Sequence, residues 1–330
     1  MRFRCCFVLT AVLLMLAGSP SRAQTPTLKV GVPSLSMFTI MFHVAQDKGF
    51  FAKEGVNVEI NHFESGSILM KALLSRAVDI ADVETALVLS AVANNDTDLR
   101  VFGSQSQRLH FALYAKNDIK TLQDLYGRVF AISGIGALPH VVILALMDKA
   151  KLDADKITLV SVGGTGARLS ALVAGKVDST VGEFSPKIEA EPTLHRLAVV
   201  SPELPLYMAQ ATTTWADTLA AKKDVIEKYQ RAMVEATRWA YTHKDEMIEA
   251  AQKHIPVSRE ELSKVYDFYV LAQVWAINGE ADRARLVYMQ DLGVKLQTQN
   301  KAVDVDKLLD LGIYKNVTAK LGTRDYPKTK

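Results

Sequence analysis

Residues 72–79 read Ala-Leu-Leu-Ser-Arg-Ala-Val-Asp and residues 171–178 read Ala-Leu-Val-Ala-Gly-Lys-Val-Asp, so one theme returns after 99 residues. Each copy follows a loop of small residues and is followed, after a short apolar stretch, by Glu84 or Glu183. The spacing of apolar residues in each copy predicts a helix, a turn and a buried strand. We therefore expect two similar α/β lobes with these glutamates at equivalent strand ends.

Strands and helices alternate on both sides of the repeat, which favours parallel sheets covered on both faces. We predict an α/β fold of two lobes, each a mostly parallel sheet flanked by helices, with a helical C-terminal extension. Residues 24–112 together with 208–330 would form the first lobe, and residues 113–207 the second. Predicted strands are 28–32, 56–63, 79–83, 99–104, 110–115, 128–133, 157–162, 179–182 and 197–200, with an extended segment at 207–213. Predicted helices are 39–53, 68–75, 84–93, 138–151, 168–174, 184–190, 222–243, 245–254 and 259–277.

Ligands of open α/β sheets bind at the carboxyl ends of the strands. If two such edges face one another, they form a cleft between the lobes. Its floor would be the two places where the chain crosses from lobe to lobe, near 110–115 and 207–213.

The N-terminal segment predicts export. Two arginines precede the apolar residues 5–18, and Ser21-Arg22-Ala23 follows them, which is the pattern of a signal peptide over 1–23. Its removal would leave 36 basic residues facing 36 acidic ones, so no basic excess indicates nucleic-acid binding. It would also remove the two cysteines, leaving no disulfide and no thiol nucleophile.

Two candidate ligand-binding loops belong to the first lobe. Ser34, Ser36 and Phe38 follow the first strand, and Ser65 and Ser67 precede a helix. Hydroxyls and free amides at a helix N-terminus suit an anion. Helix capping alone would also explain these serines.

The second lobe offers Ser133, Gly134, Thr165 and Arg168. Glycine permits close approach of the backbone to a ligand. An arginine in the first turn of a helix opposes the helix dipole, so an anionic ligand or a carboxylate of the other lobe could account for Arg168. A solvated surface arginine is the alternative.

Acidic and aromatic residues point to a different ligand. Glu84 and Glu183, if both faced the cleft, would favour an amine or a protonated ring, and Asp82 adds to this tendency. Phe38 and Trp215 could stack on a flat ligand, although core packing is the commoner role of aromatic residues. The anion and cation interpretations conflict, and a zwitterion would satisfy both.

Features of an enzyme are missing from the sequence. No histidine pair has the spacing of a helical metal site, and no Gly-x-Ser-x-Gly motif is present. We expect no catalysis, no metal and no cofactor.

Three stretches resemble a known family. Residues 43–58 are similar to its segment A-x-x-x-G-F-F-x-x-x-G-L-x-V, and residues 65–82 and 163–178 to its segment G-x-x-x-x-x-A-L-x-x-G-x-x-D-I. The family comprises periplasmic solute-binding proteins of ABC importers for nitrate, sulfonates, taurine and thiamine-pyrimidine precursors. The resemblance extends over about 28–240, with Ala77 standing where a turn glycine is usual.

This resemblance implies a type II periplasmic-binding-protein clamp. A small molecule would bind between the lobes, the lobes would close, and the closed monomer would dock on an inner-membrane ABC permease. A sensor that signals to a membrane partner is an alternative. The family also resembles a pyrimidine synthase of thiamine biosynthesis, but that enzyme depends on cysteines that the mature chain would lack.

Overall fold

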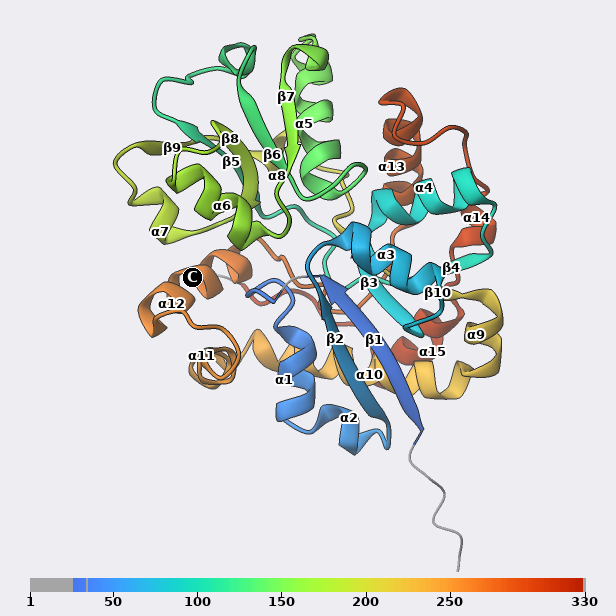
Figure 1. The fold of residues 1–330 in the computed structure, drawn as a ribbon. Coiled ribbons are helices and arrows are strands. Elements are labelled where there is room, and N and C mark those ends of the chain that lie inside the picture. The colour runs from blue at the N-terminus through green and yellow to red at the C-terminus, as the bar shows by residue number, and fades with distance from the viewer. Residues whose placement is uncertain (1–25, 34, 329–330) are drawn as a thin grey trace, which may run out of the picture.

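The computed structural model describes residues 26–33 and 35–328, and its strands form two five-stranded sheets (Figure 1). The predicted signal peptide lies outside the described residues. The first sheet has the order β2 (Asn57–Phe63), β1 (Thr27–Pro33), β3 (Ile80–Glu84), β10 (Gln210–Trp215), β4 (Leu99–Gly103). The second has the order β7 (Thr158–Ser161), β6 (Val129–Ile132), β8 (Ser179–Glu183), β5 (Phe111–Lys116), β9 (Leu194–Val199).

One strand in each sheet runs against its neighbours. β1 is parallel to β2 and β3, and β6 is parallel to β7 and β8. β10 is antiparallel to β3 and β4, and β5 is antiparallel to β8 and β9. The two-sheet α/β prediction is confirmed, but the sheets are mixed. The reversed strands are the two chain crossings, which enter each sheet from the other half of the protein instead of returning through a helix.

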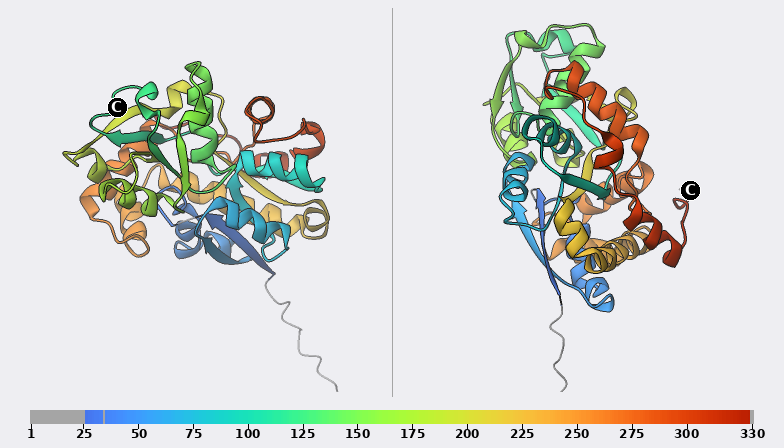
Figure 2. Two further views of the ribbon diagram at one scale, coloured as in Figure 1. Left: turned by 45° about the horizontal axis from the view of Figure 1, so that its top comes forward. Right: turned by 90° about the vertical axis from the view of Figure 1, so that its right-hand side faces the viewer.

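Helices cover both sheets, and the last third of the chain is almost entirely helical (Figures 1 and 2). The helices of the first two thirds are α1 (Met41–Asp47), α2 (Phe50–Lys53), α3 (Gly66–Leu74), α4 (Thr85–Asn95), α5 (Leu138–Lys149), α6 (Thr165–Val173), α7 (Pro186–Glu189) and α8 (Val200–Glu203). Those that follow β10 are α9 (Ala216–Ala221), α10 (Lys223–Ala240), α11 (Lys244–Gln252), α12 (Arg259–Leu271), α13 (Arg283–Lys295), α14 (Val305–Leu308) and α15 (Gly312–Leu321). Short 3₁₀-helices span Leu122–Leu125 and Ala154–Lys156.

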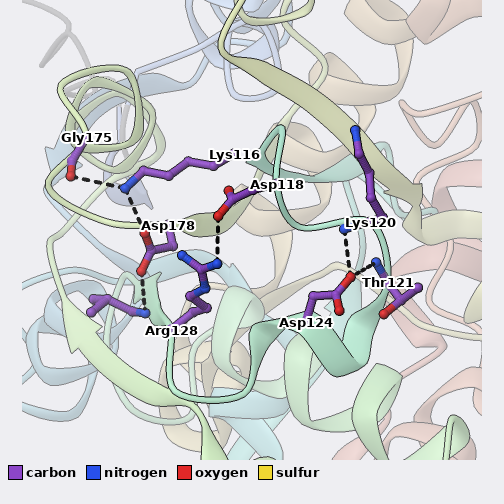
Figure 3. A network of polar contacts seen from close by, with 9 residues as sticks. Lys116, Asp118, Lys120, Thr121, Asp124, Arg128, Gly175 and Asp178 are labelled. Atoms are coloured by element: carbon purple, nitrogen blue, oxygen red, sulfur yellow. Dashed lines mark hydrogen bonds and ion pairs between the residues drawn. The ribbon is translucent and has the colours of Figure 1, made fainter.

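The sequence repeat corresponds to a structural repeat. β3 and β8 hold the same place in their sheets. Each is preceded by an aspartate that accepts from one backbone amide and one lysine ammonium. Asp178 accepts hydrogen bonds from the Val129 amide (2.8 Å) and the Lys116 ammonium (2.7 Å), as part of the network in Figure 3. Asp79 accepts from the Lys29 amide (2.9 Å) and the Lys222 ammonium (2.6 Å). Each aspartate thus ties the start of β3 or β8 to the neighbouring parallel strand and to a lysine. Lys116 ends the reversed strand β5, and Lys222 follows the helix after the reversed strand β10.

Two local predictions need correction. The helix predicted over 39–53 is divided into α1 and α2, because Gly49 adopts a left-handed conformation (φ 76°). The turn position that matches Gly175 is Arg76 and not Ala77. Gly175 has a φ of 68° and Arg76 a φ of 60°, so both are left-handed. This conformation is unusual for an L-residue, and the Arg76 guanidinium pairs with Asp217 (2.9 Å).

Buried apolar side chains of both sheets belong to one large core cluster, and a smaller cluster lies between the second sheet and helices α6 and α7. Among the C-terminal helices, α14 and α15 contact β4 of the first sheet, and α10 contacts α1 and α2. Others reach the helices that flank the second sheet, because α12 contacts α7 and Lys295 of α13 pairs with Asp148 of α5. Among the described residues, no helix combines the length and apolar character needed to cross a bilayer.

Candidate functional site

A cavity lies where the carboxyl ends of the central parallel strands of the two sheets meet. Its lining comes from the loops after β1, β2 and β6, the ends of β3 and β8, the start of β10 and the first turns of α5 and α6. Its volume is about 40 Å³. The lining residues are Pro33, Ser36, Phe38, Thr39, Glu64, Ser65, Gly66, Glu84, Phe111, Ser133, Leu138, Pro139, Gly164, Thr165, Arg168, Glu183 and Gln210.

Most of the residues expected to bind ligand come together at this cavity. Eight of them line it: Ser36, Phe38, Ser65, Glu84, Ser133, Thr165, Arg168 and Glu183. Ser67 and Gly134 lie beside it and face one another, since a Cβ on Gly134 would lie 2.7 Å from Ser67 Oγ. Ser34 lies outside the described residues.

Trp215 does not reach the cavity. It ends β10 at the edge remote from Gln210, which lines the cavity at the start of the same strand. Its indole N–H donates to the Leu73 carbonyl (2.8 Å), and the Arg76 guanidinium lies over its ring (4.4 Å to the centroid). The expectation that Trp215 stacks on a ligand is therefore wrong: β10 extends its last residue away from the floor of the site.

Arg168 is a buried cation, not a solvated surface residue, with 2% of its surface exposed. Its guanidinium donates to the carbonyls of Gly163 (2.6 Å) and Val181 (3.0 Å) and to the hydroxyls of Thr165 and Thr180 (both 3.2 Å). Burial lowers its pKa to about 10, against the raising effect of Glu183 and Glu84. Arg168 thus remains charged at neutral pH and ties the loop before α6 to β8.

The Glu183 carboxylate lies between the second sheet and the C-terminal helices. It stands at the end of β8 and accepts from the Tyr269 hydroxyl of α12 (3.1 Å). Desolvation raises its pKa, whereas Ser36, Tyr269, Arg168 and Phe38 act in the opposite direction. Glu183 thus joins β8 to α12 and lines the cavity together with Ser36 and Phe38 of the loop after β1.

Glu84, at the equivalent end of β3, has fewer partners. Its carboxylate lies against Gly66, where a Cβ would come within 1.6 Å of Oε2. Desolvation raises its pKa, with its own backbone amide and Arg168 acting in the opposite direction. Oε2 is buried and has no hydrogen-bond partner. One acceptor of this carboxylate is thus free to meet a ligand.

Gln210 is a cavity residue that sequence reasoning missed. It faces Glu84 directly in the antiparallel pairing of β10 with β3, and its Oε1 is buried without a partner. The segment 207–213 was expected to form the cleft floor, and counting alternate residues along it would have singled out Gln210.

An aromatic wall closes one side of the cavity. Phe38 and Phe111 lie with ring centroids 6.0 Å apart, and His110 packs against both from outside the lining. His110 is buried with neither ring nitrogen hydrogen-bonded to a side chain, and desolvation lowers its pKa to about 3. A neutral imidazole therefore supports this wall without adding charge to it.

Asp82 lies behind Glu84 on the same face of β3. Its Oδ1 accepts from the Thr212 hydroxyl (3.1 Å), and 2% of its surface is exposed. Desolvation, together with the charge of Glu84, raises its pKa to about 7, against the effect of the Thr212 and Gln105 donors. Asp82 does not line the cavity, so it acts on a ligand only through Glu84.

The arrangement is suited to holding a small polar molecule by hydrogen bonds from both sheets. Glu84 Oε2 and Gln210 Oε1 on the first sheet and Ser133 Oγ on the second are buried polar atoms without partners. Leaving such atoms unpaired costs about 1–3 kcal/mol each. A ligand that paired them would recover this free energy only when both sheets surround it.

Comparisons with known proteins identify the family. A family model described as NMT1/THI5 like matches residues 38–247, so the chain belongs to the NMT1/THI5-like family. The predicted family membership is confirmed. YtlA of Bacillus subtilis (strain 168), which carries the provisional name of a binding protein, is 26% identical over 279 residues, or 78% of this chain and 82% of YtlA.

Solved structures share the fold at low sequence identity. The alkanesulfonate-binding protein SsuA from Xanthomonas axonopodis pv. citri, bound to MOPS, has a TM-score of 0.72 and 17% identity, covering 86% of this chain and 98% of SsuA. The periplasmic nitrate-binding protein NrtA from Synechocystis PCC 6803 has a TM-score of 0.75 and 13% identity, covering 91% and 90%. The chain has the periplasmic-binding-protein fold.

Proposed function

We propose that this protein is an exported solute-binding protein that captures one small polar molecule in the cavity between its two sheets. The observation that carries the proposal is the set of buried, unpartnered polar atoms contributed by both sheets. A molecule that pairs them stabilises only the closed arrangement, so closure reports that the site is filled.

The proposed partner is an ABC permease of the inner membrane. Support comes from family membership and from the fold shared with sulfonate- and nitrate-binding proteins. Residues 1–23 would act as the signal peptide, the mature monomer would work in the periplasm, and the lobes would comprise 24–112 with 208–330 and 113–207. The ligand would be a sulfonate, taurine or nitrate, or an amine-bearing heteroaromatic such as a pyrimidine precursor.

The test is a ligand screen of the mature chain followed by small-angle X-ray scattering. Thermal shift against sulfonates, nitrate, carboxylates, amines and pyrimidines should find a stabilising ligand, and calorimetry should give one site per chain. The radius of gyration should fall when that ligand is added. Gly134→Trp, which puts a large side chain against Ser67, is the control, and it should prevent the decrease.

A confirmed ligand that leaves the radius of gyration unchanged would contradict the clamp. Recovery of chemically altered ligand after incubation would instead favour the enzyme alternative. Binding and closure without delivery of the ligand to an ABC permease would favour a sensor.

A further inference from the structure

We propose that the cavity selects a small planar cation with several N–H donors, of the amidinium or guanidinium class, rather than a sulfonate or nitrate. This inference rests on the proposed solute-binding function and specifies the chemistry of the same site.

The first observation is a pair of free acceptors. Glu84 and Gln210 are directly opposed in the pairing of β3 with β10, so their side chains start about 5 Å apart. Glu84 Oε2 and Gln210 Oε1 are both buried without partners, and the two residues are 7% and 2% exposed. An ionised carboxylate only accepts hydrogen bonds, so what fits against Glu84 must donate.

The second observation is that Arg168 is already occupied. A guanidinium has five N–H groups, and four hydrogen bonds join Arg168 to Gly163, Thr165, Thr180 and Val181. A single N–H remains, so Arg168 cannot offer the two parallel N–H groups with which arginine typically binds an oxyanion. Its role is to hold the loop before α6.

The charges and shape of the cavity agree with a cation. Three carboxylates line it together with one guanidinium: the buried Glu84 and Glu183, and the exposed Glu64. Negative groups therefore outnumber positive ones when the carboxylates are ionised, and a cationic ligand would offset part of this excess. The small volume of the cavity, about 40 Å³, suits a small ligand. The rings of Phe38 and Phe111 favour a flat cation, because aromatic faces attract positive charge.

The remaining N–H groups of such a ligand would have acceptors on the far side. Ser133 Oγ of the second sheet lines the cavity, and Ser67 Oγ lies beside it on α3. Both hydroxyls are buried without partners. A planar cation could thus bond to Glu84 and Gln210 on one edge and to a serine on the other.

The experiment is calorimetry on the mature full chain at constant ionic strength. The probes are guanidinium and acetamidinium chloride, with methylammonium as a non-planar cation and sodium nitrate, methanesulfonate and taurine as the competing class. We expect the planar cations to bind most tightly. Glu84→Gln should weaken their binding at least tenfold, while Glu59→Gln, at an exposed position of β2 in the same sheet, should leave it unchanged.

Glu84→Gln tests binding and not folding, because the amide removes a buried charge and keeps the shape of the side chain. Gln210→Met provides a second variant, for which we expect a smaller loss of affinity. Tighter binding of nitrate or a sulfonate would overturn the inference and leave the proposed function standing. Unchanged affinity in Glu84→Gln would also overturn it. If neither the probes nor the wider screen gave a ligand, both proposals would fail.

Discussion

Glu84 and Glu183 end equivalent strands, but their carboxylates have different surroundings. Glu183 accepts a hydrogen bond from Tyr269, whereas Glu84 keeps one oxygen free beside Gly66. The repeat alone suggests one role for both residues. The difference arises from segments that only one of them contacts, so each glutamate has to be considered with its own neighbours.

Gly66 is the residue on which the position of Glu84 depends. In Gly66→Ala, the new methyl group would lie 1.6 Å from the present position of Glu84 Oε2, so the carboxylate must move. We expect at least a tenfold loss of ligand affinity in calorimetry. Gly166→Ala in the first turn of α6 is the matched control, because nothing lies within 4 Å of its new methyl group. The control should keep its affinity and gain about 0.5–1 kcal/mol of stability. Equal affinities in the two variants would contradict the account.

Asp82 should make stability fall as the pH rises. Its pKa is raised from 3.8 to about 7 by burial, so between these values the unfolded chain loses a proton that the folded chain keeps. Asp82→Asn should remove this part of the pH dependence. Urea unfolding should show the variant gaining stability relative to the wild type from pH 4 to pH 8, by more than about 1 kcal/mol. A constant difference over that range would show that Asp82 does not titrate in this way.

At the scale of elements, Asp79 and Asp178 fasten the central strands of the two sheets. Each accepts one backbone and one ammonium hydrogen bond, so Asp79→Ala and Asp178→Ala should each cost about 1.5–3 kcal/mol in chemical unfolding. Asp118→Ala is the control from the network of Figure 3, because its bond to Arg128 (2.6 Å) lies on the surface. That variant should lose no more than about 1 kcal/mol. Similar losses in all three variants would show that the repeated aspartates have no special role.

The elements were largely predictable from sequence, and the reversed strands were not. Apolar periodicity placed β1, β3, α5 and α10 within a few residues of their observed ends. The Ser65 cap was also found: its hydroxyl accepts from the Ile68 amide (3.4 Å). Strand direction depends on pairing between distant segments, which periodicity does not contain.

The candidate site was predictable only where it lies next to the repeat. Glu84 and Glu183 follow from the two copies, because the carboxyl ends of equivalent strands must lie close together if the lobes face each other. Arg168 follows from its unfavourable place in the first turn of the helix that contains the second copy. Tyr269 had no sequence signal, since it lies 86 residues beyond Glu183 in the chain and reaches it through tertiary packing. The position of Trp215 was predicted wrongly, because the sequence does not show which end of β10 faces the cavity.

On the scale of the whole molecule, α12 and α13 connect the C-terminal helices to the second sheet. Phe268 of α12 stacks on Phe184 (4.4 Å between ring centroids), and Tyr269 bonds Glu183. Lys295 of α13 pairs with Asp148. In the proposed clamp, these contacts would favour the closed arrangement even before ligand is added.

Tyr269→Phe should loosen that arrangement. The change removes one donor from a buried carboxylate and keeps the ring, at a cost of about 1–3 kcal/mol to the contacts across the cavity. Scattering should give a larger radius of gyration without ligand, and amide exchange should accelerate at Ser36 and Phe38. Lys295→Ala, which removes an exposed ion pair of the other helix, should change both quantities less. Identical exchange rates at Ser36 in wild type and Tyr269→Phe would rule out this role for the hydroxyl.

The position of β10 inside the first sheet also affects the order of assembly. All strands of the second sheet lie between β4 and β10 in the chain, whereas the first sheet needs β10 between β3 and β4. A chain that emerges from the ribosome amino end first can complete the second sheet once residue 199 is out. In the first sheet, β1 can pair with β2 and β3 early, but β4 can join only when β10 is out, at residue 215. Pairing across so long an interval is slow. The sheet that begins first is thus completed last, and this delay would leave the proposed secreted precursor incompletely folded when it reaches a translocation channel.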